Sequence, residues 1–279
     1  MAADGHRLAE LEITSAANPR IKQVVALRRR RGRDQANVTL VEGQAEIRLA
    51  LAAGVRPEAM YYCPDLNPAG ADAVIAAAAE HGAQLIRVPR LVFEKISYRE
   101  GPDGLLAVVP AIGASLDQLA VSASPLIVVC AGLEKPGNLG AILRTADALG
   151  VAAVIAADPV TDWGNPNVVR ASKGTVFSVP VASASSAEAL AWIAARSLTL
   201  VAAAPDGDVP LTGADLSGPT AIVVGSEARG LPGAWLGRAD IRVRIPMFGR
   251  ADSLNVATAA AILVYEAVRQ RLANPAATP

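Results

Sequence analysis

The sequence has few of the residues that mark disulfide frameworks and metal sites. Among 279 residues there are only two cysteines, Cys63 and Cys130, and two histidines. Both cysteines end apolar, strand-like runs, which is typical of small buried side chains in a reducing compartment. No group of residues has the spacing of zinc ligands, so we expect no metal.

Long apolar runs and an excess of charge of one sign are lacking too. No stretch reaches the roughly 18 uninterrupted apolar residues of a membrane helix. The first residues, MAADGHRLAELEITS, have no apolar core like that of a signal peptide. Lysine plus arginine equals aspartate plus glutamate, at 26 each, so the bulk charge indicates no particular partner. We expect a soluble cytoplasmic protein.

Strand-like and helix-like segments alternate along the chain, and 52% of the residues are hydrophobic, enough for a substantial core. The alternation predicts a parallel or mixed α/β sheet in each half. A segment with little charge and many small residues, 110–124, separates the halves and is the candidate linker. We therefore expect domains over residues 1–109 and 125–279. Strands are expected at 38–43, 58–64, 83–89, 104–110, 125–132, 151–157, 175–181, 198–204, 221–227 and 241–247, and a last helix at about 253–272.

A basic segment lies near the start of the chain. Residues 18–34, NPRIKQVVALRRRRGRD, carry seven lysines and arginines against one aspartate. Such a run fits a phosphate backbone, although a solvated, positively charged helix end has the same composition. The candidate nucleic-acid-binding residues are Arg20, Lys22, Arg28, Arg29, Arg30 and Arg31.

Three loops follow strands of the second half, at strand ends where α/β sheets usually bind ligands. The first, GLEKPGNLG (132–140), has the glycine spacing of a phosphate-binding P-loop. It lacks the Lys and Ser or Thr that would follow, and it also lacks the dinucleotide pattern G-x-G-x-x-G. A nucleotide-dependent enzyme on a plain Rossmann-like sheet is therefore disfavoured.

The first loop leads into an amphipathic helix, predicted over residues 138–150. Asn138 is placed to cap this helix, and Gly150 to end it. Arg144 lies outside the apolar stripe, where an ion pair with Asp147 would explain it as well as a ligand would.

The other two loops are also built for close approach of the backbone. The second, VVGSEARGLPG (223–233), surrounds Glu227 with three glycines. The third begins at RIPM (244–247), and either Ser253 or Asn255 can cap the last helix.

Taken together and in this order, the loops resemble the three motifs of the SpoU family of RNA ribose 2′-O-methyltransferases, in the SPOUT superfamily. Residues 169–181 also look like the family's segment between motifs one and two, and Ala257 departs from a position that is commonly serine. The matching residues are Asn138, Gly140 and Arg144 in the first motif, Gly225, Glu227, Gly230 and Leu231 in the second, and Ile245, Pro246, Met247, Ser253, Leu254, Asn255 and Val256 in the third.

The resemblance extends into the first half of the chain. Residues 40–54, LVEGQAEIRLALAAG, are similar to the opening of the small ribosomal-protein-like RNA-binding domain that many of these enzymes carry, with Glu42 and Gly43 as its marks. The implied fold is α/β throughout, with this small domain preceding a C-terminal SPOUT domain that contains a deep trefoil knot. The family also implies a homodimer through the C-terminal domain.

The resemblance implies methyl transfer from S-adenosylmethionine to a ribose 2′-hydroxyl, with no metal. Arg144 would lower the pKa of that hydroxyl or orient it, since an arginine pKa above ~12 makes it a poor base. The implied catalytic residues are Arg144, Asn138, Glu227, Ser253 and Asn255. The implied cofactor-binding residues are Gly225, Ile245, Leu254, Ala203, Ser226 and Met247.

The RNA substrate stays open at this point. The ribosomal-protein-like front half favours 23S ribosomal RNA over transfer RNA, and the composition is similar to that of members that confer resistance to drugs such as thiostrepton or avilamycin. The alternatives are a transfer RNA 2′-O-methyltransferase, a methyltransferase acting on a base nitrogen, and a catalytically inactive RNA-binding protein of the same fold.

Overall fold

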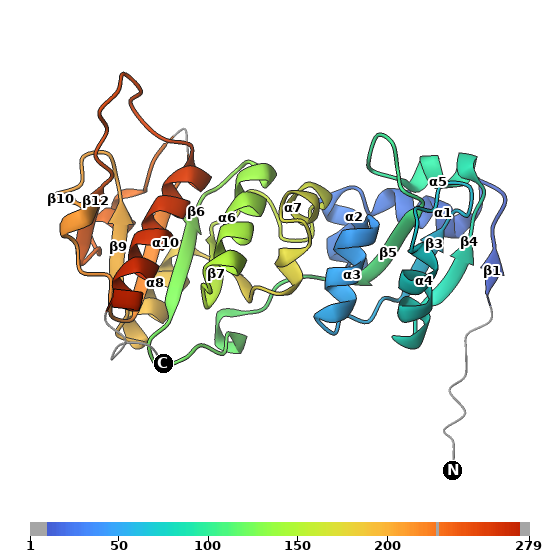
Figure 1. Cartoon of the computed structure of the whole chain (residues 1–279), viewed down its shortest axis with the longest axis horizontal. Coiled ribbons are helices and arrows are strands. Elements are labelled where there is room, and N and C mark those ends of the chain that lie inside the picture. Colours follow the sequence, from blue (N-terminus) through green and yellow to red (C-terminus); the bar gives the residue numbers. More distant parts are fainter. Residues whose placement is uncertain (1–9, 227–228, 274–279) are drawn as a thin grey trace, which may run out of the picture. The chain divides into compact units, whose positions relative to one another are not determined.

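The computed structural model describes residues 10–226 and 229–273 (Figure 1). They form two compact units. The N-terminal unit comprises the chain up to residue 112 together with residues 163–178, and the C-terminal unit comprises residues 113–162 and those from 179 onward. The chain thus leaves the C-terminal unit for residues 163–178 and then returns to it. No helix within the described ranges is both long and apolar enough to cross a bilayer.

The N-terminal unit contains a five-stranded sheet in the order β1-β4-β3-β5-β2. Strand β5 runs antiparallel to both of its neighbours, and the other pairs are parallel. The predicted mixed α/β sheet is confirmed. The strands are β1 (Leu11–Glu12), β2 (Val38–Glu42), β3 (Ala59–Tyr62), β4 (Gln84–Arg87) and β5 (Leu105–Pro110).

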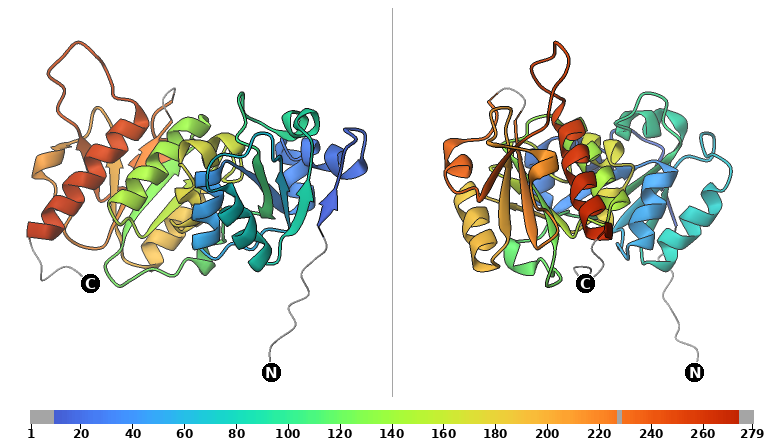
Figure 2. Two further views of the ribbon diagram at one scale, coloured as in Figure 1. Left: turned by 45° about the vertical axis from the view of Figure 1, so that its right-hand side comes forward. Right: turned by 60° about the vertical axis from the view of Figure 1, so that its left-hand side comes forward.

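Helices cover both faces of this sheet (Figures 1 and 2). α1 and α5 pack together on one face, where Ile21 and Phe93 are fully buried in one core with Tyr61 of the sheet. α3 and α4 pack together on the other face, and α2 and α7 contact β2. The helices are α1 (Pro19–Ala26), α2 (Arg30–Ala36), α3 (Gln44–Ala52), α4 (Ala71–Glu80), α5 (Arg90–Ile96) and α7 (Pro166–Ala171).

The C-terminal unit contains a seven-stranded sheet in the order β10-β12-β9-β11-β6-β7-β8. All of its strand pairs are parallel. Such sheets are buried on both faces, and β6 and β7 are accordingly apolar along their whole length. The strands are β6 (Leu126–Ala131), β7 (Ala153–Ala157), β8 (Val181–Ala184), β9 (Thr199–Ala203), β10 (Val209–Pro210), β11 (Thr220–Gly225) and β12 (Ile241–Arg244).

α6 (Pro136–Ala148) and α10 (Val256–Ala273) pack side by side on one face of this sheet, and α8 (Ser186–Ala195) covers the other together with α9 (Gly233–Leu236) (Figures 1 and 2). Cys130 is buried in β6, and burial raises the pKa of its thiol to about 12. Cys63 is buried as well. The prediction that both cysteines are small buried side chains is confirmed.

Two local predictions differ from the structure. The strand predicted at 175–181 is wrong over residues 175–180, because Thr175–Phe177 form a 3-10 turn and β8 begins at Val181. Gly174 presses this turn against α3: its φ is +85°, and an added Cβ would lie 3.2 Å from the Cα of Glu46. The expected linker is partly packed, since Leu119 is buried and the indole N–H of Trp192 donates to the Leu116 carbonyl at 2.9 Å.

Candidate active site

The three loops singled out in the sequence lie at one edge of the C-terminal sheet. β6, β11, β9 and β12 are parallel neighbours, so their C-terminal ends share that edge. Gly225 at the end of β11 is in register with Ala131 of β6, and Ala203 of β9 with Val243 of β12. Four predicted cofactor-binding residues from three segments therefore come to one edge: Ala203, Gly225, Ser226 and Ile245.

Asn138 connects the first loop to the third. The prediction that Asn138 caps its helix is wrong, because α6 begins two residues earlier with Pro136 in its first turn. The Asn138 side-chain oxygen instead accepts a hydrogen bond from the Asn255 amide at 3.1 Å. These residues are 117 positions apart in the chain. The contact brings two predicted catalytic side chains together at the starts of α6 and α10.

Asn255 also caps α10. Its side-chain oxygen accepts hydrogen bonds from the backbone N–H groups of Ala257 at 3.0 Å and Thr258 at 3.4 Å. Ser253, the other candidate for this cap, lies exposed two residues earlier. One side chain therefore fixes the start of the helix with its oxygen and contacts Asn138 with its amide nitrogen.

Arg144 lies further along α6 and is exposed. Within the described residues its side chain makes no hydrogen bond and no ion pair, so an ion pair with Asp147 does not account for it. Its guanidinium has five N–H donors in a planar fork that suits phosphate and other oxygen acceptors. These donors are therefore available to a ligand on the exposed face of α6.

The second loop makes a turn that only glycine permits at its start. A Cβ added to Gly225 would lie 2.3 Å from the carbonyl carbon of Gly230. The carbonyl of Ser226 accepts from the Gly230 N–H at 2.9 Å, and Ser226 itself is 8% exposed. Glu227 lies outside the described residues, so its predicted catalytic role stays a prediction.

The third loop has backbone N–H and C=O groups that make no hydrogen bond to other described residues. Among the described residues we find no hydrogen bond to or from residues 246–254. Ile245 and Leu254 at its two ends are half-buried, whereas Met247 is 40% exposed. A loop with unused backbone donors and acceptors next to apolar side chains fits an adenine base held by main-chain groups. The residues at this edge therefore fit S-adenosylmethionine.

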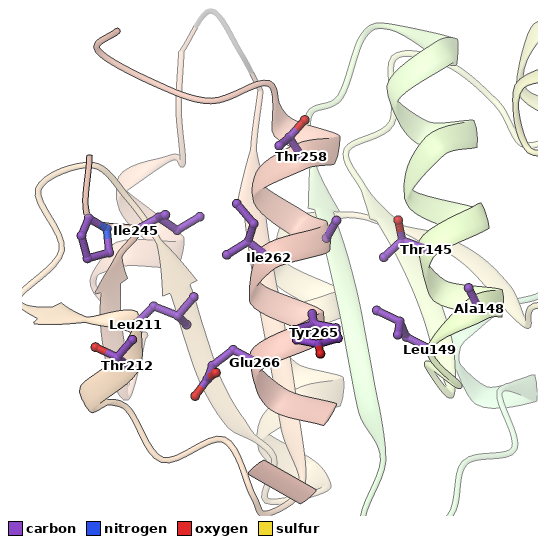
Figure 3. A pocket seen from close by; sticks show the side chains of 12 residues that line it. Thr145, Ala148, Leu149, Leu211, Thr212, Ile245, Thr258, Ile262, Tyr265 and Glu266 are labelled. Carbon is purple, nitrogen blue, oxygen red and sulfur yellow. The ribbon is translucent and has the colours of Figure 1, made fainter. Parts of the chain in front are cut away.

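An apolar groove of about 600 Å³ runs along the outer faces of α6 and α10 (Figure 3). Thr145 and Leu149 line it from α6, and Ile262 and Tyr265 from α10. Ile262 is 37% and Tyr265 61% exposed, which is a large apolar exposure for two neighbouring turns of one helix. Ile245 also lines the groove, which therefore borders the third loop.

The basic segment is divided by the structure. Arg28 donates hydrogen bonds to the carbonyls of Lys95 and Ser97, so its guanidinium is engaged at the end of α5. Arg33 is 4% exposed and donates to two backbone carbonyls, which its sequence context, a run of arginines, did not indicate. The remaining predicted RNA-binding residues are exposed: Arg20, Lys22, Arg29, Arg30 and Arg31.

Comparison with known families bears directly on this site. Residues 125–265 match the model of the SpoU rRNA Methylase family. The chain belongs to this family. Residues 18–107 match the MRM3-like substrate binding domain. The predicted SpoU membership is thereby confirmed, and the front half of this SpoU protein contains a substrate-binding domain.

Individual relatives agree with the family assignment. The 23S rRNA (uridine(2479)-2'-O)-methyltransferase of Streptomyces viridochromogenes is 38% identical over 201 residues, 70% of each chain. The 23S rRNA (guanosine(2553)-2'-O)-methyltransferase RlmP of Bacillus subtilis is 28% identical over 91% of this chain and 98% of its own. An AdoMet-bound rRNA methyltransferase from Sinorhizobium meliloti superposes with a TM-score of 0.85 at 32% identity, covering 92% of this chain and 97% of that one. The predicted SPOUT-type fold and the use of S-adenosylmethionine are confirmed.

Proposed function

We propose that this SpoU protein transfers a methyl group from S-adenosylmethionine to a ribose 2′-hydroxyl of 23S ribosomal RNA. The observation that carries the proposal is the hydrogen bond between Asn255 and Asn138, which joins the first and third motifs. Arg144 of the first motif is exposed on the same helix as Asn138. Such a polar cluster, at a loop edge with free main chain, suits a polar substrate and a nucleoside-containing donor.

The reaction forms a C–O bond, breaks a C–S bond and releases the hydroxyl proton. When bound, the donor supplies an electrophilic methyl group on a sulfonium, which needs only in-line placement. Arg144 donates hydrogen bonds to the 2′-oxygen and so stabilises the negative charge that develops there. Asn138 and Asn255 orient the ribose, and Ser253 and Glu227 complete the polar rim.

The donor would lie along the sheet edge described above. Gly225 and Ser226 would face it with main chain from the second loop, and the backbone around Met247 and Leu254 would hold the adenine. Ala203 and Ile245 would contribute apolar contacts at the ends of β9 and β12.

The N-terminal unit would bind the RNA through its exposed basic residues. Charge supports this, because each arginine or lysine that neutralises a phosphate releases a counterion. The curated relatives modify a uridine in one case and a guanosine in the other. The methylated nucleotide therefore has to be mapped in this protein, and drug resistance stays a prediction that depends on that position. The substrate implies action in the cytoplasm.

We also propose a homodimer and a deep trefoil knot for the C-terminal unit. The apolar groove along α6 and α10 supports the dimer, because Ile262 and Tyr265 would lose their exposure against a second copy. The strand order supports the knot, because β12 lies on the far side of β9 while the helix that follows it packs on α6 and β11.

The test is transfer of radiolabelled methyl from S-adenosylmethionine to unmodified ribosomal RNA and transfer RNA, with the labelled position mapped. We expect label on one ribose of 23S RNA. Arg144→Ala should lower the rate by about 100-fold or more while cofactor affinity is unchanged. Arg238→Ala, an exposed arginine near the opposite sheet edge, is the matched control and should keep the wild-type rate.

Other outcomes would overturn specific parts of the proposal. Label on transfer RNA alone would replace the substrate, and label on a base would replace the acceptor atom. Wild-type protein that neither transfers label nor binds S-adenosylmethionine would contradict the assignment of all three loops.

A further inference from the structure

One exposed aromatic side chain of the N-terminal unit takes part in a series of side-chain hydrogen bonds outside the methyltransferase site. Tyr98 follows α5 and is 38% exposed. Its hydroxyl accepts a hydrogen bond from the Asn167 amide at 2.9 Å, and the Asn167 oxygen accepts one from Arg170 at 2.8 Å. Asn167 and Arg170 belong to α7, within the segment 163–178 that the chain contributes between its first and second motifs.

A buried carboxylate holds Tyr98 from beneath. Glu42, at the end of β2, is 8% exposed and accepts from the Tyr98 backbone N–H at 2.8 Å. Its other oxygen accepts from the Ser97 hydroxyl at 2.5 Å, and that hydroxyl accepts from the Arg99 N–H at 3.1 Å. Arg28 donates to the Ser97 carbonyl from the side of α1. The ring is therefore fixed before any ligand arrives, so binding there costs little ordering entropy.

Two cationic residues follow Asn167 in the same segment. Arg170 is exposed and uses only part of its guanidinium for Asn167. Lys173 is exposed just beyond α7. The Asp103 carboxylate, in the loop that follows Tyr98, is paired with Arg99 at 3.8 Å. The other aromatic side chains of the described N-terminal unit are buried or half-buried, so Tyr98 is its most exposed ring.

We propose that Tyr98, Arg170 and Lys173 form a contact for single-stranded RNA, in which a base stacks on the Tyr98 ring and a neighbouring phosphate contacts the two cations. Aromatic rings flanked by arginine are the usual platform for unpaired bases. The inference rests on the proposed function, since the RNA bound is the substrate. It makes segment 163–178 a substrate-binding element of the N-terminal unit, separate from the predicted basic segment and the catalytic residues.

Binding of a fluorescein-labelled 20-nucleotide oligouridylate, followed by anisotropy, tests the contact. Tyr98→Ala should weaken binding about tenfold or more. Arg170→Ala should weaken it less and reduce the slope of log affinity against log salt by about 0.7. Arg56→Ala is the charge-matched control, because Arg56 is exposed before β3, at the opposite edge of the same sheet, and it should bind like wild type.

Tyr98→Phe separates stacking from a merely structural role. It keeps the ring and removes the hydroxyl that contacts Asn167, so binding should stay within about threefold of wild type. Equal losses for Phe and Ala would overturn stacking. Photo-crosslinking of 4-thiouridine in the oligonucleotide should label the tryptic peptide 96–99, and absence of that crosslink with bound RNA would also overturn the inference. Arg170→Ala keeps the test available if Tyr98→Ala fails to fold.

Failure of this inference and failure of the proposed function are distinguishable. If the wild type methylates ribosomal RNA while Tyr98→Ala and Arg170→Ala bind RNA as tightly as it does, only the contact is refuted. If the wild type neither binds S-adenosylmethionine nor transfers label, the methyltransferase proposal is refuted even where the RNA contact is measured. If the wild type binds no RNA at all, both are refuted.

Discussion

Asn255 has two roles that reside in two different atoms. Its side-chain oxygen caps α10, and its amide nitrogen donates to Asn138. A cap of this type contributes to stability whatever the protein does, whereas the contact with Asn138 matters for the shape of the polar cluster. Substitution can therefore separate the stability of the helix from the geometry of the site.

Asn255→Ser should keep the stability and lose the activity. Serine is a good N-cap but is too short to reach Asn138, so we expect the free energy of unfolding to stay within about 0.5 kcal/mol of wild type. The methyl-transfer rate should fall about tenfold or more. Asn255→Ala should lose the activity and also about 1 kcal/mol of stability. Urea unfolding and initial rates measure both quantities, and a wild-type rate for the serine variant would refute the positioning role.

At the scale of the element, α10 joins the site to the far edge of the unit. Its buried face, with Leu263 and Ala267, packs beside α6. Its last turn is tied to the loops at the N-terminal ends of the strands, where Arg271 donates to the Gly218 carbonyl at 2.5 Å. Burial lowers the pKa of the Arg271 guanidinium, although it stays charged. A helix held at both ends keeps Asn255 at a defined position.

The contact between Glu266 and Arg269 on α10 should make the stability of the protein depend on pH. Hydrogen bonds from Arg269 and Gln270 lower the pKa of Glu266 to about 2, in spite of partial burial. Because the pKa of Glu266 is lower in the folded state than its unfolded-state value near 4.5, the ionised carboxylate stabilises the folded protein at pH values above 4.5. This stabilisation is lost as the pH falls toward 2. Glu266→Gln should be less stable than wild type at pH 7, and the gap should shrink between pH 4.5 and 2. Urea unfolding across this range measures the gap, and a gap independent of pH would contradict the assignment.

At the scale of the whole molecule, sequence order and spatial order differ. Residues 163–178 are flanked by parts of the C-terminal unit but complete the N-terminal one, where they contact β2 and α3. The Thr39 hydroxyl of β2 donates to the Gly164 carbonyl at 2.5 Å inside this unit. The substrate-binding unit is therefore built from two separate stretches of the chain.

The assembly state depends on the groove along α6 and α10. Tyr265→Glu places a charge on this apolar face, which a dimer would have to desolvate, so we expect the variant to be monomeric at micromolar concentration. Leu91→Glu is the control, because Leu91 is 80% exposed on α5 of the other unit. Light scattering coupled to gel filtration measures the mass. A dimer for Tyr265→Glu, or a monomer for the wild type, would refute the proposed interface.

Most of the helices and strands, and the three loops, can be predicted from the sequence. Apolar runs such as those of β6 and β11 predict buried strands, since a strand between two helical layers has no polar face. The amphipathic stripe of α6 and the glycines of the second loop are local signals as well. These patterns depend only on neighbours within a few residues, so the sequence by itself predicts the elements and the order of the motifs.

Contacts between distant residues had no such signal. The pairing of Asn138 with Asn255, the transfer of residues 163–178 to the N-terminal unit and the burial of Arg33 within a run of arginines all depend on packing between elements far apart in the chain. Local pattern specifies which face of an element is apolar, but not which other element covers it. The residue types thus predict the chemistry of the site. That these residues lie together at one edge of the sheet is decided by the strand order and the helix packing.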